Sequence, residues 1–216
     1  MSYFVHLCGR KQNSNIDAQF CTLESILKSQ KLLTNNCPIF WVQQVWLRLN
    51  DPRLVLNNKK HRLAGVGLTD DLPRLDVQRE FSMACLSLID HKDILAHAQV
   101  FGYFGIAFKR DQVLGSKAEK VKYVDPDVKD NLPHPDSPEW RLLQDNRNDS
   151  QSEWRLFPEQ GLNHVPFIQQ DIAFIVIPTT DWGPRIRQLF SSLKQKWSDP
   201  IKVYAFETDD WLEISF

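Results

Sequence analysis

The chain has 216 residues, of which 42% are hydrophobic and 25% charged, and its formal net charge is −1. These values are ordinary for a globular protein with a sizeable core. A net charge this close to zero excludes binding of a polyanion through an overall positive field. There is no run of about 18 apolar residues that could span a membrane, no secretory signal pattern, and no metal or disulfide spacing among the four cysteines. We expect one cytoplasmic domain, residues 1–216, with reduced thiols and no metal.

The first elements predicted are a strand at residues 3–7, which carries His6, and a helix that buries a leucine stripe up to about residue 33. Thr22 is the expected N-cap of this helix, with Glu24 in the first turn. His6 is open to two interpretations, a structural histidine or a catalytic one. Residues 38–49 fit either a strand or a helix.

Next, residues 63–69 predict a buried strand that ends at Thr69, followed by two aspartates that either cap a helix or form part of a site. Residues 76–95 predict a mostly helical segment, with an interruption at residues 90–92. No metal-ligand spacing arises between His91 and His97.

Residues 97–109 hold the most informative stretch, a helix end followed by a glycine turn at Gly102 and a strand at residues 103–108. Gly105 interrupts this apolar strand, which usually marks a bulge or a group pressing close against the backbone. The stretch is therefore either a core strand or one wall of a ligand cleft.

The second half predicts strands at residues 117–124, 152–158, 171–178 and 202–206, a long surface loop at about 125–152, and a helix that begins at Pro184. In the 152–158 strand, Glu153 and Arg155 point to one face and Trp154 to the other. Residues 211–216 are either a hairpin partner or a docking tail.

Four pieces of the chain, in this order, resemble the AbiGi-type abortive-infection family of bacterial anti-phage proteins. They are His6 with the helix at residues 23–33, the Thr69-Asp70 strand end, His97 with the segment FGYFGIAFK, and Glu153-Trp154-Arg155 followed by the strand at 171–178. The agreement extends over about residues 3–190. The resemblance implies a component of a bacterial antiviral toxin–antitoxin system that acts by abortive infection.

The same residues are similar to ADP-ribosyltransferase-like folds, α+β proteins whose split, mostly antiparallel sheets are flanked by helices and hold NAD as the substrate. This similarity implies that Glu153, or else Glu139, stabilises the positive charge that develops at the ribose as the nicotinamide bond breaks. His6 would bond a ribose hydroxyl. The other residues implied in NAD binding are Leu7, Thr69, Tyr103, Phe104 and Arg155, with Arg10 as a second candidate for the pyrophosphate. The chain has no glycine-rich dinucleotide motif, which excludes a hydride-transfer enzyme of that class.

Three functions follow as hypotheses. The first is a toxin that transfers ADP-ribose from NAD to a macromolecular acceptor, protein or nucleic acid, and is held off by a cognate antitoxin. The second is a non-catalytic antitoxin or scaffold that binds a cognate toxin. The third is a protein that binds or modifies RNA, with aromatic rings as stacking platforms. Seven tryptophans and the apolar tail at residues 211–216 favour a surface for a partner protein.

Overall fold

The computed structural model describes residues 1–8, 15–36, 82–112, 117–124, 139, 142–145, 152–159, 162–193 and 197–215. Its strands are β1 Ser2–Leu7, β2 Lys31–Leu33, β3 Asn35–Asn36, β4 Ser82–Asp90, β5 Gly105–Phe108, β6 Glu119–Lys120, β7 Lys122–Val124, β8 Leu143–Asp145, β9 Glu153–Leu156, β10 His164–Pro166, β11 Ile172–Ile177, β12 Ile201–Ala205 and β13 Asp210–Ile214. Its α-helices are α1 Ile16–Ser29, α4 Ile94–Phe101 and α6 Gly183–Leu193. The expectations for residues 38–71, including Thr69, and for Arg10 lie outside the described residues.

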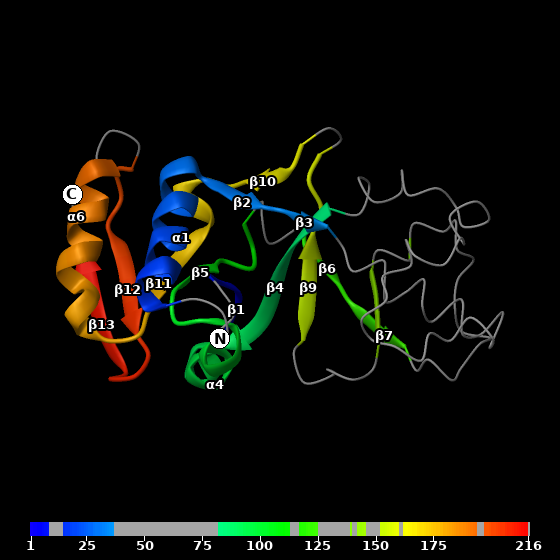
Figure 1. Cartoon of the computed structure of the whole chain (residues 1–216), viewed down its shortest axis with the longest axis horizontal. Coiled ribbons are helices and arrows are strands. Elements are labelled where there is room, and N and C mark those ends of the chain that lie inside the picture. The colour runs from blue at the N-terminus through cyan, green and yellow to red at the C-terminus, as the bar shows by residue number, and fades with distance from the viewer. Residues whose placement is uncertain are drawn as a thin grey trace.

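A nine-stranded sheet forms the centre of the described structure, in the order β13-β12-β11-β5-β1-β4-β9-β6, with β3 paired to one end of β4 (Figure 1). All of its ladders are antiparallel except β11–β12. Two further pairs lie outside it, β10 with β2 and β7 with β8. The fold is therefore mixed α and β with a large, mostly antiparallel sheet, as expected.

The sheet buries apolar side chains on both faces. Helices α1 and α6 pack on one face and form the larger core with residues such as Phe4 and Ile106. Helix α4 packs on the other face and forms a smaller core around Val5 and Phe174. At about 2 kcal/mol for each fully buried large apolar side chain, these two layers supply most of the driving force for folding.

Helix α1 begins earlier and ends earlier than the sequence predicts. Its N-cap is Asn15, whose Oδ1 accepts a hydrogen bond of 2.7 Å from the backbone N–H of Ala18. Thr22 lies inside the helix, and its hydroxyl donates a hydrogen bond to the Ala18 carbonyl. Its assignment as the N-cap was therefore wrong. The helix ends at Gln30 in the left-handed conformation, and the next residues form β2 because they pair with β10.

The largest error concerns residues 76–95, where the described part is mainly a strand. β4 runs from Ser82 to Asp90, and the helix begins only at Ile94, after a 3-10 turn at His91–Asp93. The alternation of Ala84, Leu86 and Leu88 toward the larger core is a two-residue period that was readable in the sequence. Pairing with β1 and β9 on both sides satisfies the backbone and decides for a strand.

The glycines around β5 behave as predicted. Gly102 ends α4 with a φ of 117°, and its N–H donates to the Ala98 carbonyl. A Cβ at Gly105 would lie 2.5 Å from the carbonyl oxygen of His6, so a neighbouring backbone does press close at this position. Tyr103 and Phe104 precede the strand and are not part of it.

The C-terminal elements match their predicted positions. β11, α6 and β12 form a crossover with parallel strands, and β13 is the hairpin partner of β12, which settles the choice left open for residues 211–216. The loop predicted at about 125–152 contains the short strand β8, which pairs with β7. The 117–124 strand is divided into β6, which pairs with β9, and β7, which pairs with β8.

Candidate functional site

His6 lies near the end of the central strand β1. Its Cα partner in β5 is Ile106, a buried member of the larger core. Paired residues of an antiparallel ladder point to the same face, so the His6 side chain is on the face that carries α1 and α6. Phe4 is on this face too, and its ring contacts Trp154 with the centroids 5.1 Å apart.

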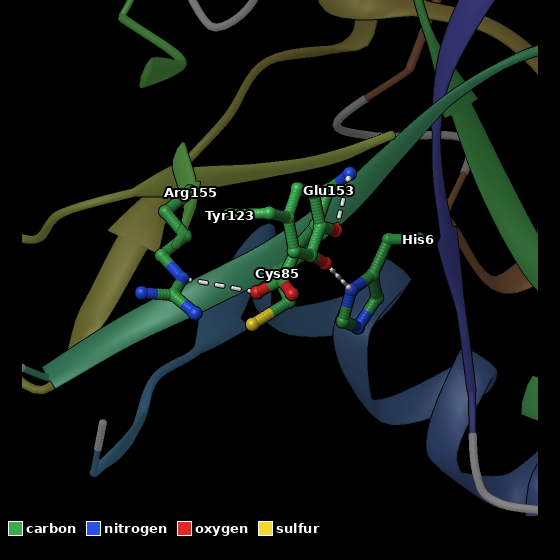
Figure 2. Close-up of polar contacts among 5 residues, drawn as sticks. All are labelled: His6, Cys85, Tyr123, Glu153 and Arg155. Carbon is green, nitrogen blue, oxygen red and sulfur yellow. Dashed lines mark hydrogen bonds and ion pairs between the residues drawn. The ribbon is translucent and has the colours of Figure 1, made fainter. Parts of the chain in front are cut away.

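A fork in the sheet lies beside His6. The β1–β4 register ends at Val5 and Ser87, and β3 pairs with β4 only at Ser82 and Met83. In the gap between them, the carbonyl of Cys85 accepts a 3.0 Å hydrogen bond from His6 Nδ1 (Figure 2). A carbonyl can only accept, so the proton is on Nδ1 and the neutral tautomer has its lone pair on Nε2.

The environment of His6 favours its neutral form. Burial lowers the pKa of His6, and the hydrogen bond to the Cys85 carbonyl partly opposes that shift. The imidazole thus closes a break in the β1–β4 ladder while remaining uncharged. This is the structural role that the sequence left open for His6.

Acid is expected to destabilise the protein through this residue. The unfolded imidazole takes up its proton at about pH 6.5, whereas the native one takes it up at a lower pH. The unfolded state therefore binds more protons as the pH falls below that value, and the free energy of unfolding decreases by at most about 1.4 kcal/mol per pH unit for this group. Urea unfolding at neutral and mildly acidic pH measures the effect.

The variant His6→Gln is the control, because glutamine keeps a donor and does not titrate. In this variant the free energy of unfolding should decrease less at mildly acidic pH. The decrease that remains comes from other groups, among them His97, whose pKa is also lowered by burial. An identical pH dependence in the variant and the wild type would contradict the assignment.

Glu153 and Arg155 form an ion pair on β9. Arg155 Nε donates to Glu153 Oε1 at 2.9 Å, and the side chains are 1% and 18% exposed (Figure 2). The backbone N–H of Glu153 lies 3.4 Å from the hydroxyl of Tyr123. Trp154 points to the other face and packs on Phe4, so the predicted division of these three side chains is confirmed.

The two residues expected to act together are not brought together. Val5 pairs with Ser87, and Ser87 pairs with Glu153, so these three share one face of the sheet. His6 follows Val5 directly and points to the opposite face. His6 and Glu153 therefore lie on the two strands that flank β4, and their side chains point to opposite faces of the sheet.

The remaining predicted residues have internal partners. Phe104 is fully buried and stands edge-on to the rings of Phe20 and Trp182. Tyr103 stacks on Phe206, and its backbone N–H donates to the buried side chain of Gln19. Both rings pack on other protein side chains in this structure.

Leu7, another residue expected at the NAD site, packs against the smaller core opposite Gly105. Glu139 is exposed. The sequence pattern did not indicate Cys85 or Tyr123 as site residues, although they complete the cluster in Figure 2. Cys85 lies directly across from Arg155, and only the strand pairing reveals this.

The described residues hold no group of three or more histidine, cysteine or acidic side chains that could bind a metal ion. Cys8, Cys21 and Cys85 form no disulfide. None of the helices described is both long enough and apolar enough to cross a bilayer. A comparison of the chain with protein-family models, curated proteins and solved structures finds no match.

Proposed function

We propose that the protein is a component of a bacterial abortive-infection anti-phage system, and that it acts there as the non-catalytic, partner-binding member. The membership rests on the ordered resemblance described above. The non-catalytic role is supported above all by one observation, that β4 separates His6 from Glu153.

The occupied hydrogen-bonding groups support the same role. His6 Nδ1 donates a hydrogen bond to the carbonyl of Cys85, and Arg155 Nε donates one to the Glu153 carboxylate. Phe104, which a nicotinamide would have to displace from its neighbours, is enclosed in the core. Each of these side chains has a structural task that explains its presence in a folded protein.

A second candidate is transfer of ADP-ribose from NAD in an ADP-ribosyltransferase-like fold. It is favoured by the fork between β1 and β4 and by the Glu153 carboxylate, which is partly exposed and oriented by a buried guanidinium. In this reaction the ribose–nicotinamide bond breaks with its electron pair leaving on nicotinamide. The acceptor bonds the ribose carbon, and its proton passes to Glu153, which stabilises the positive charge in between.

Inducible expression of the chain alone in bacteria separates the two candidates. The partner-binding role predicts normal growth, and relief of the arrest caused by the product of the gene next to its own when the two are expressed together. Growth arrest by the chain alone, with transfer of label from radioactive NAD to cell extract, would overturn the proposal and support the enzyme.

Two matched variants make the second outcome specific. Glu153→Gln should abolish arrest and labelling if Glu153 is catalytic, whereas Glu139→Gln, in the repeated Glu-Trp-Arg triplet, should leave both unchanged. If only Glu139→Gln abolishes arrest and labelling, the catalytic acid is Glu139 and not Glu153. Thermal unfolding of each variant identifies effects that come from folding.

A further inference from the structure

The strand β13 leaves one edge of the large sheet open. β12 pairs with it over the full length from Asp210 to Ile214, and no strand among the described residues pairs with its other side (Figure 1). Alternate residues of such a strand direct their N–H and C=O groups away from the sheet. An open edge of this kind accepts an additional strand from another chain.

A fixed aromatic ring lies on this edge strand. Trp211 is 48% exposed, although its ring contacts Tyr204 at 4.8 Å and Phe174 at 5.1 Å between centroids. The ring centroid of His91 lies 6.5 Å from that of Trp211. Trp211 is therefore held in place by its inner contacts and offers its outer part, which is the character of a binding hot spot.

The charged side chains nearest to Trp211 along the chain are all acidic. Glu207, Asp209, Asp210 and Glu213 are all exposed, within seven residues that contain no basic side chain. Asp209 accepts a hydrogen bond from Tyr204. Glu213 is on the same face as Trp211, and the one basic residue paired with this strand is Lys202 of β12.

We infer that the open edge of β13 binds an extended, basic segment of a partner protein, which adds to the sheet as a further strand. An arginine of this segment would stack on Trp211 and pair with Glu213, because guanidinium groups bind both aromatic faces and carboxylates. The inference rests on the proposed partner-binding function and assigns the partner interface to the β13 edge. A second copy of this chain is disfavoured, since it would bring the same carboxylates to the same edge.

Fluorescence anisotropy with a labelled synthetic peptide of alternating valine and arginine tests the inference on the full chain. We expect saturable binding that weakens at high salt, with no binding of the alternating valine and glutamate peptide. Trp211→Ala should weaken binding by about tenfold or more, and Glu213→Gln by severalfold. Glu24→Gln, a partly exposed acid on α1, is the matched control and should have no effect.

Three results would overturn the inference: equal binding of the acidic peptide, binding unchanged by Trp211→Ala, or pairing of two copies of the chain through β13 in sedimentation experiments. A peptide with methylated backbone nitrogens should bind weakly, and full binding would exclude strand addition. In the growth assay, rescue by wild type and equally by Trp211→Ala would reject this surface and leave the proposed function standing. No rescue by wild type would reject the function, and the peptide measurements would still decide on the surface.

Discussion

Replacing Gly105 with alanine is expected to lower the free energy of unfolding by about 3 kcal/mol, the upper end of the usual cost of overpacking. The new Cβ would lie 2.5 Å from the His6 carbonyl oxygen and 2.7 Å from Leu7 Cδ2. The leucine side chain can turn away, but the carbonyl belongs to the central strand β1, which pairs with β5 at His6 and Leu7 and is anchored to β4 up to Val5. β5 must therefore move away from β1. Urea unfolding followed by circular dichroism measures the loss.

Gly183→Ala is the matched control for this substitution. A Cβ there would approach Leu212 Cδ1, the end of a flexible side chain, at 3.3 Å, so we expect a change of less than about 1 kcal/mol. If Gly105→Ala were as stable as Gly183→Ala, the close approach of β1 to β5 would be wrong.

Removing the buried guanidinium with Arg155→Ala is expected to cost about 3–5 kcal/mol, because it leaves the Glu153 carboxylate without its charged partner and opens a cavity. The distance from Arg155 Nε to Glu153 Oε1 is 2.9 Å, and the Arg155 side chain is 1% exposed. Glu153→Gln should cost less, about 1–2 kcal/mol, since an amide oxygen still accepts from Arg155 Nε. Urea unfolding compares both variants with the wild type.

The exposed pair on α1 provides the control for Arg155→Ala. Lys28 Nζ and Glu24 Oε1 are separated by 2.7 Å, but the side chains are 50% and 33% exposed. Solvent screens such a pair, so Lys28→Ala should change the free energy of unfolding by no more than about 0.5 kcal/mol. An equal effect of the two substitutions would show that the burial of Arg155 adds nothing to the stability.

Several local features could be predicted because a few neighbouring residues suffice to specify them. The alternation in β11, the helical spacing in α6 and the glycine stop at Gly102 each have a physical cause within the segment. The opposite directions of Trp154 and its neighbours follow from the strand period alone. The close approach at Gly105 was expected from the absence of a side chain in an apolar strand.

Features that depend on a partner distant in sequence could not be predicted in this way. β4 carries both a helical spacing, from which it was assigned as a helix, and a two-residue alternation, and only its pairing with β1 and β9 decides for the strand. His6 bonds a carbonyl 79 positions further along the chain. No pattern of residue types near His6 contains that information.

The sequence by itself determined the composition of an ordinary globular protein, the identity of most C-terminal elements and the residue types available for chemistry. The tertiary structure alone decided which of these residues meet, because strand order and register assign each side chain to a face of the sheet. That assignment gave His6 to one face and Glu153 to the other. It also left Trp211 exposed on an open edge.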